Sequence, residues 1–155
     1  MKVRERFEFL SQLSVQSQGP SSFPLTSPSS SPISPRMNNN TPARLHHEDL
    51  DSYQAAICFL ALAARLLASF PRGYGSMADQ LKRASLSVPL NLAEGYGKRA
   101  ASDRARFYDI ARGSAHECGA LLDASKVLSL VDEQTYFEGK ALLHRIVSML
   151  VKMSA

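Results

Sequence analysis

A group of basic residues in the middle of the chain has the composition of a phosphate-binding surface. Between Arg72 and Arg112 the chain carries eight Lys and Arg residues against four Asp and Glu residues. A local excess of positive charge attracts the phosphates of nucleic acid, even where the charges of the whole domain balance. Contacts of this kind tolerate any base sequence and weaken with salt. The candidate nucleic-acid-binding residues are Lys98, Arg99, Arg104, Arg106, Lys82 and Arg112.

The other reactive side chains do not form a catalytic or metal-binding pattern. Metal-binding helix bundles use Glu-x-x-His pairs on facing helices, and the chain has no such pair among Glu94, His116, Glu117 and His144. His116 and Glu117 are adjacent, so they point in different directions on a helix. Cys118 has no base at a demonstrated geometry, and the two Gly-Tyr-Gly sequences lack the strand and lysine of a phosphate loop. We therefore expect no enzymatic activity, no cofactor and no metal.

The segment from Gln80 to Gly95 has helical periodicity but contains a proline and several polar residues. Pro89 removes a backbone donor and clashes with the carbonyl of Ser85, which costs about 3 kcal/mol or more in a helix interior. We predict that Pro89 bends this helix. We also predict that Asn91 donates a hydrogen bond to a carbonyl near the proline, with help from the neighbouring serine hydroxyls.

An antiparallel hairpin that turns near Ala100 would bring the polar residues of two helices together. It pairs Arg83 with Glu117, and it pairs Glu94 with Arg106. A carboxylate buried between helices needs a charged or hydrogen-bonding partner. We therefore interpret these residues as an internal clamp, with a ligand pocket or an oligomer contact as the alternatives. The predicted structural polar clamp consists of Arg83, Asn91, Glu94 and Glu117.

Gly113 and Ser114 lie opposite Leu86 and Ser87 in the same hairpin. A glycine in the middle of a helix costs about 1 kcal/mol relative to alanine. A close crossing of two helices would offset this cost. We therefore predict that both small residues pack against the facing helix.

Apolar residues recur at three- and four-residue spacing in four stretches. They predict helices over about 49–70, 76–98, 102–129 and 132–153, with Ser102 as the N-cap of the third and Asp132 opening the fourth. The residues expected to face the core are Tyr53, Ile57, Leu60, Ala64 and Leu67, with Ala56, Ala63 and Phe70 beside them, in the first helix; Met77, Leu81, Ala84, Val88 and Leu92 in the second; Phe107, Ile110, Ala111, Ser114, Cys118, Leu121, Ser125 and Leu128 in the third; and Tyr136, Phe137, Leu143, Ile146, Val147 and Leu150 in the fourth.

The connections between these helices are short, which forces neighbouring helices to run antiparallel. The sequence therefore predicts an all-α, antiparallel up-down-up-down four-helix bundle over residues 46–155. The apolar stripes are broad, so we expect self-association. The most apolar run, residues 55–68, is interrupted by Arg65, so we expect no membrane-spanning segment.

Residues 1–45 have a different composition, dominated by Ser, Pro, Gln and Asn, which predicts a disordered tail. Most of the formal charge of +4 belongs to this tail. Met37 is an alternative start, in which case the first 36 residues do not belong to the working protein. The first residues lack the apolar run of a secretory signal. The two cysteines, Cys58 and Cys118, are expected to be core residues in a reducing compartment, so we expect a cytoplasmic protein.

Two sequence blocks resemble one bacterial family. They are QLKRASLSVPLNLAEG, from Gln80 to Gly95, and FYDIARGSAHE, from Phe107 to Glu117. Together with Phe70-Pro71 before the second helix, they closely resemble the four-helix-bundle proteins encoded in 23S rRNA intervening sequences, over essentially residues 46–155. The resemblance implies a homopentamer, and a relation to the accessory protein of diversity-generating retroelements, which binds nucleic acid and a reverse transcriptase. It implies no catalytic residues.

The residues and the resemblance together predict a non-enzymatic, oligomeric bundle that binds nucleic acid or serves as an assembly platform. The expected partners are further copies of the chain, RNA or DNA, and a reverse transcriptase or another protein, with no membrane. The alternative is a purely protein-binding scaffold that uses the apolar stripes of the first and fourth helices and has no affinity for nucleic acid. A metal-dependent enzyme is the third alternative.

Overall fold

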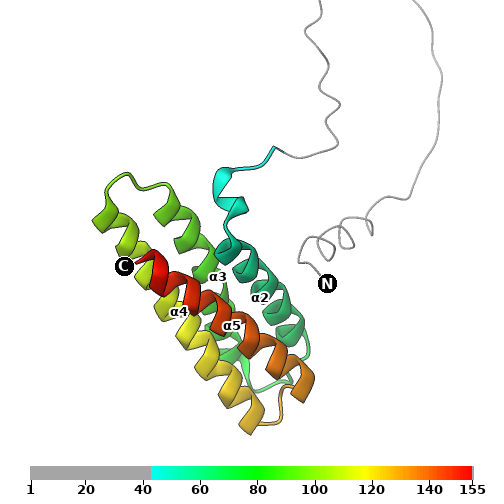
Figure 1. The fold of residues 1–155 in the computed structure, drawn as a ribbon. Coiled ribbons are helices and arrows are strands. Elements are labelled where there is room, and N and C mark those ends of the chain that lie inside the picture. The colour runs from blue at the N-terminus through cyan, green and yellow to red at the C-terminus, as the bar shows by residue number, and fades with distance from the viewer. Residues whose placement is uncertain (1–42, 155) are drawn as a thin grey trace, which may run out of the picture. The chain divides into compact units, whose positions relative to one another are not determined.

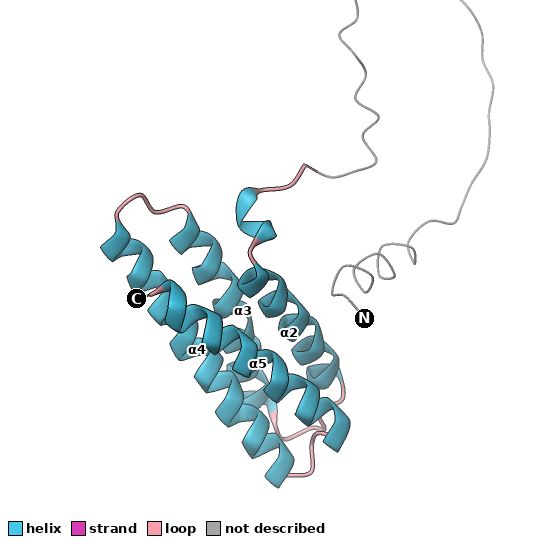
Figure 2. Ribbon diagram, viewed as in Figure 1, coloured by secondary structure: helices cyan, strands magenta, loops and turns pink. Residues whose placement is uncertain are grey.

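The computed structural model describes residues 43–154, which form four α-helices preceded by one short 3-10 helix (Figures 1 and 2). The elements are η2 (His46–Asp49), α2 (Asp51–Ala68), α3 (Gly75–Tyr96), α4 (Ala101–Val127) and α5 (Glu133–Met153). No strand occurs among these residues. The predicted disordered tail up to residue 42, and the alternative start at Met37, lie outside the described residues.

Each helix packs mainly against two others, so the four helices close into a bundle. α2 contacts α3 and α5, and α4 contacts the same two helices. Successive helices run in opposite directions, which places the α3–α4 connection at one end and the α2–α3 and α4–α5 connections at the other (Figure 1). The prediction of an all-α four-helix bundle is confirmed.

α3 has the buried stripe that its sequence predicts. Leu81, Ala84, Val88 and Leu92 are all buried. Pro89 is buried within the same helix and does not end it. The predicted stripe omits Leu86 and Leu90, and both are exposed, so the periodicity identifies the core face of α3.

The core prediction for α2 was right for Ala56 and Ala63, which are buried, but its main stripe was displaced by about one position. The buried residues include Ala55, Phe59, Leu62 and Leu66, whereas Ala64, expected in the core, is exposed. This helix is apolar almost all round, so the periodicity does not single out one face. The other members of the predicted stripe are half-buried: Tyr53, Ile57, Leu60 and Leu67.

By length and composition alone, α2 is long and apolar enough to cross a membrane, with a mean hydropathy of 1.2. The expectation that no segment reaches this length was therefore too strict. The apolar character of α2 has a structural use within the bundle, because Phe59 and Leu62 are fully buried among the other helices.

In α4 and α5 the core prediction was right for some residues and wrong for others. Ala111, Cys118 and Ser125 of α4, and Leu143, Ile146 and Leu150 of α5, are buried. Ile110, Leu128 and Phe137 are 43%, 45% and 58% exposed instead. The buried residues that the prediction missed are Tyr108, Ala115, Leu122 and Gly139.

Of the two predicted helix starts, one is right and the other is wrong. Asp132 caps α5 as expected, since its carboxylate accepts a hydrogen bond of 2.8 Å from the backbone nitrogen of Thr135. Ser102 is not the N-cap of α4, because the helix already begins at Ala101 after Ala100, which provides no side-chain cap.

The close helix crossing occurs at Gly95 and not at Gly113. A Cβ atom on Gly95 would lie 2.7 Å from Cε1 of Tyr108, whereas one on Gly113 would meet nothing within 4 Å. The predicted packing role of Gly113 was therefore wrong. Gly95 allows the Tyr108 ring to lie against the α3 backbone.

The two cysteines differ in burial. Cys118 is fully buried, and Cys58 is half-buried. Burial raises the pKa of the Cys118 thiol to about 12, with a further contribution from the charge of Glu117. The Cys118 thiol is therefore protonated near neutral pH.

Candidate nucleic-acid interface

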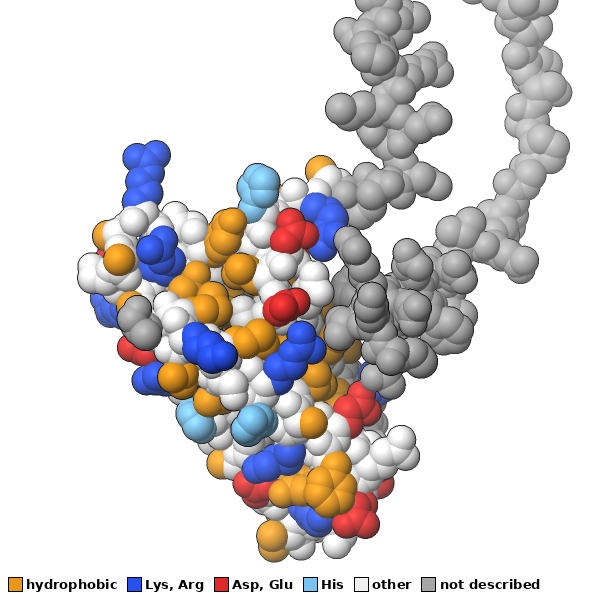
Figure 3. All heavy atoms as spheres, in the orientation of Figure 1, with side chains coloured by type: hydrophobic (Ala, Val, Ile, Leu, Met, Phe, Trp, Pro, Cys, Tyr) orange, Lys and Arg blue, Asp and Glu red, His pale blue; other side chains and the backbone are white. Residues whose placement is uncertain are grey.

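Four of the six predicted basic residues lie at the end of the bundle formed by the α3–α4 connection. We call Lys98, Arg99, Arg104 and Arg106 the rim. Lys98 and Arg99 stand on the connection itself, and Arg104 and Arg106 stand on the first turns of α4. Figure 3 shows Lys and Arg side chains projecting at this end of the molecule.

The other two predicted basic residues are not part of the rim. Lys82 lies in α3, sixteen residues before Lys98, which is about 24 Å along the helix at 1.5 Å per residue. Arg112 lies farther along α4, and its guanidinium pairs with Asp109 at 3.2 Å. These two residues are therefore weaker candidates for phosphate contact than the rim.

Lys98 is the rim residue with the most contacts. Its ammonium lies 3.2 Å from the Glu94 carboxylate and 4.7 Å from the centre of the Phe107 ring. These contacts link the connection to both flanking helices. The pair with Glu94 is solvent-exposed, so it contributes only about 0–1 kcal/mol and can exchange for a phosphate.

The guanidinium groups of the rim have no carboxylate partner within residues 43–154. Arg99 and Arg106 are exposed, and Arg104 is half-buried. Burial raises the pKa of the Tyr108 hydroxyl, and the neighbouring charge of Arg104 acts in the opposite direction. Arg99 and Arg106 therefore face solvent.

The charged clamp predicted between α3 and α4 is not formed. Glu94 pairs with Lys98 of its own helix end and not with Arg106. Arg83 and Glu117 are both exposed, and no ion pair joins them in the described structure. The hairpin numbering predicts which residues lie opposite each other, but it does not tell whether they face the core or water. These long side chains lie on the outer surface.

A chain of neutral hydrogen bonds links the two helices instead. The Asn91 amide donates to the Ser87 carbonyl at 2.8 Å and to its hydroxyl at 3.0 Å. The Ser87 hydroxyl lies 2.8 Å from the Ser114 hydroxyl, which donates to the Ile110 carbonyl at 3.1 Å. Because a hydroxyl has one proton, Ser87 is the donor to Ser114. The prediction that Ser114 packs against the facing helix is confirmed, as is the predicted bond from Asn91 to a carbonyl near Pro89.

Sequence reasoning missed the aromatic residues beside the rim. Tyr96, the last residue of α3, is 43% exposed. The His47 ring of η2 lies 6.5 Å from the Tyr96 ring and 4.8 Å from the Tyr53 ring, measured between centroids. The signal was weak because η2 has no apolar periodicity, so nothing in the sequence indicated that it folds against α3.

Comparison with known families matches the part of the chain that holds the rim and Tyr96, and the match begins just after His47. The family model described as 23S rRNA-intervening sequence protein matches residues 48–152, which include all of α2, α3 and α4 and nearly all of α5. The chain belongs to this family. The search of curated proteins finds no match. The match to the family model carries this assignment. The rim and nearly all of the four helices lie within the matched residues.

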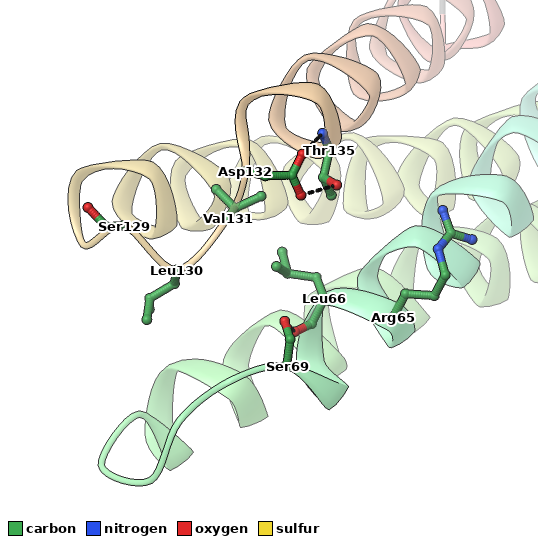
Figure 4. A pocket seen from close by; sticks show the side chains of 8 residues that line it. All are labelled: Arg65, Leu66, Ser69, Ser129, Leu130, Val131, Asp132 and Thr135. Carbon is green, nitrogen blue, oxygen red and sulfur yellow. Dashed lines mark hydrogen bonds between the residues drawn. The ribbon is translucent and has the colours of Figure 1, made fainter.

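In this family member two surface hollows lie away from the rim. One, of about 420 Å³, lies between the end of α2 and the α4–α5 connection (Figure 4). Its polar groups are already used: Asp132 accepts from Thr135 at 2.8 and 2.6 Å, and Ser69 donates to the Leu66 carbonyl at 2.7 Å. Arg65 is the charged residue left at its edge. This hollow lacks the convergent polar groups of a typical ligand site.

The second hollow, of about 410 Å³, lies between α4 and α5. Its charged residues, Asp123 and Lys140, pair with each other at 2.9 Å. His116 and His144 lie along it, and both are exposed. No group of three or more metal-ligating side chains is found in the described part of the chain. Neither hollow combines charge and exposure as the rim does.

Proposed function

We propose that this member of the 23S rRNA-intervening sequence protein family is a non-enzymatic, self-associating bundle that binds RNA or DNA through the rim. The observation that carries the proposal is the presence of four cations on the α3–α4 connection and the first turns of α4, of which only Lys98 has a carboxylate partner in the described structure. Unpaired, solvated guanidinium groups bind phosphate without first breaking an ion pair.

Self-association as a homopentamer in the cytoplasm is part of the proposal and extends the family resemblance. Leu86, Leu90 and Ile110 support an interface between copies, since these large apolar residues of α3 and α4 are 44%, 59% and 43% exposed. An oligomer presents several rims to one strand of nucleic acid. Several weak contacts then act together, which raises the overall affinity without any new contact.

The second candidate is a protein-binding scaffold without affinity for nucleic acid. The same exposed apolar residues favour it, because they fit a protein surface such as that of a reverse transcriptase as well as they fit another copy. This candidate predicts assembly and no salt-sensitive binding of RNA or DNA.

A matched pair of double variants separates the two candidates. Arg99→Glu with Arg106→Glu reverses two exposed rim residues, and Arg65→Glu with Arg72→Glu reverses two exposed arginines at the other end of the bundle. Both variants change the net charge by the same amount. Fluorescence anisotropy with labelled RNA and DNA oligonucleotides at low salt measures the affinity, and circular dichroism checks the fold.

We expect the rim variant to bind at least about tenfold more weakly than the wild type, since each lost phosphate contact lowers the electrostatic part of the affinity. The variant at the other end should bind within about twofold of the wild type. Equal losses in both variants would show that only net charge matters, and the assignment to the rim would be wrong. A wild type that binds neither RNA nor DNA would favour the scaffold.

A further inference from the structure

We propose that the rim takes single-stranded nucleic acid, and that the Tyr96 ring is the surface on which an unpaired base stacks. This inference rests on the proposed function and names the class of ligand for that site. Proteins that bind single strands combine a basic surface for the backbone with aromatic rings for the bases. The structure brings these two components together at the α3–α4 connection.

Tyr96 lies within the basic cluster. It is two residues before Lys98 and three before Arg99. Tyr96 is the last residue of α3, and Arg104 stands on the first turn of α4, on the other side of the same short connection. A base that stacked on Tyr96 would therefore have the rim cations of the connection as its nearest positive charges.

The Tyr96 ring is exposed and already positioned. Its side chain is 43% exposed. The His47 ring flanks it at 6.5 Å, and His47 is held in turn by an edge contact with Tyr53 at 4.8 Å and 83°. No hydrogen bond engages the Tyr96 hydroxyl within residues 43–154. A ring held in this way loses little conformational entropy when a base stacks on it.

The other aromatic rings near the rim are already occupied. Lys98 covers the Phe107 ring at 4.7 Å, and Tyr108 is only 3% exposed. Phe137 is the other exposed aromatic residue of the described chain, at 58%. It lies at the opposite end of the bundle, where Lys126 covers it at 5.0 Å and pairs with Glu133 at 3.5 Å. Phe137 is thus a natural control for Tyr96.

The exposed ring is what distinguishes single strands from duplexes. In a duplex each base face is stacked on its neighbours, so the bases cannot stack on a protein ring without being unstacked first. In a single strand the faces are free, and stacking on an aromatic side chain adds affinity that depends little on which base is present. A rim without Tyr96 would bind both forms through their phosphates alone.

The test compares Tyr96→Ala, Tyr96→Phe and the control Phe137→Ala in the full chain. Anisotropy is measured at one salt concentration with a labelled single strand and with a duplex of the same sequence. We expect Tyr96→Ala to weaken binding of the single strand by about tenfold and to leave duplex binding nearly unchanged. Tyr96→Phe retains the ring and should bind like the wild type, as should Phe137→Ala.

A second measurement does not depend on the stability of a variant. Photo-crosslinking of a strand that carries 5-iodouracil to the wild-type protein, followed by mass spectrometry, should identify Tyr96 or its immediate neighbours. Crosslinks confined to other helices would overturn the inference, as would equal loss of single-strand and duplex binding in Tyr96→Ala. If those results appear while the Arg99→Glu, Arg106→Glu variant still loses affinity, the inference fails and the proposed function stands. If the wild type binds neither form, both fail.

Discussion

The α3–α4 and α4–α5 connections have similar lengths, and basic and aromatic side chains lie at or beside each of them, but the charges are used differently. At the α4–α5 connection, Lys126 pairs with Glu133 at 3.5 Å, and Lys140 pairs with Asp123 at 2.9 Å. At the α3–α4 connection, the three arginines of the rim have no carboxylate partner in the described structure. The first set of charges holds two helices together, and the second set is free for a ligand.

The tyrosines beside the two connections differ in the same way, since one has its contacts satisfied by the protein and the other does not. The Tyr136 hydroxyl donates to Asp123 at 2.8 Å, and Lys126 covers the Tyr136 ring at 4.4 Å. Tyr96 has neither contact, since no hydrogen bond or cation is found on it in the described residues. The comparison teaches that a basic and aromatic composition does not by itself indicate a binding surface. What matters is whether the protein already satisfies those groups.

Replacing a tightly packed glycine with alanine tests whether the packing beside the α3–α4 connection is more rigid than the packing between α4 and α5. In Gly95→Ala the new Cβ would lie 2.7 Å from the buried Tyr108 ring, which has little freedom to move. In Gly139→Ala it would lie 2.7 Å from a Leu122 methyl, which can rotate away. We expect Gly95→Ala to lower the free energy of unfolding by about 1–3 kcal/mol, and Gly139→Ala by less. Urea unfolding followed by circular dichroism measures both.

Gly113→Ala is the control for this pair. Gly113 is exposed, and an added Cβ would meet nothing within 4 Å. Because alanine favours helix over glycine, this variant should gain up to about 1 kcal/mol in the free energy of unfolding. If Gly95→Ala were as stable as Gly113→Ala, the close approach of Tyr108 to α3 would be wrong.

Acid should weaken the α4–α5 connection, with a smaller effect. Hydrogen bonds from Lys140 and Tyr136 lower the pKa of the Asp123 carboxyl below its ordinary value of 3.8. A carboxyl with a lowered pKa in the folded state stabilises the fold above its unfolded pKa, and this stabilisation is lost as the pH falls through the folded pKa. Asp123→Asn should therefore melt below the wild type at about pH 7, and the difference should shrink well below pH 3.8.

Tyr136→Phe checks the cause of that effect. It removes one donor to Asp123 and leaves Lys140 in place, so its melting temperature should fall between those of the wild type and Asp123→Asn at neutral pH. A difference between the wild type and Asp123→Asn that stayed constant from neutral pH to strong acid would rule out the carboxylate as its source.

The sequence predicted the fold well because its four helices have strong periodicity and short connections. It identified the core face of α3, where polar residues contrast with Leu81 and Val88. It misplaced the core face of α2, which is apolar on nearly all sides. Periodicity detects a contrast between an apolar and a polar face, so a helix that is apolar on nearly all sides does not show which face is buried.

The residues of the candidate site could be predicted only in part, because contacts between elements and the rotation of each helix decide the rest. The rim could be predicted because its four cations lie close together in the sequence, on the α3–α4 connection and the first turns of α4. Tyr96 could not, because its importance depends on η2 folding back to place His47 beside it. The clamp failed because the positions of Arg83 and Glu117 could be estimated from a hairpin, but their exposure depends on the rotation of each helix.

The salt dependence of nucleic-acid binding tests the central claim most directly. The observed binding constant of a single strand is measured from low to moderate salt for the wild type and for the Arg99→Glu, Arg106→Glu variant. Each phosphate contact contributes about −0.7 to the slope of log K against log salt. We predict a steep negative slope for the wild type and a slope nearer zero by about one unit or more for the variant. A wild-type slope near zero, or the same slope for both proteins, would contradict the assignment of the rim as the nucleic-acid interface.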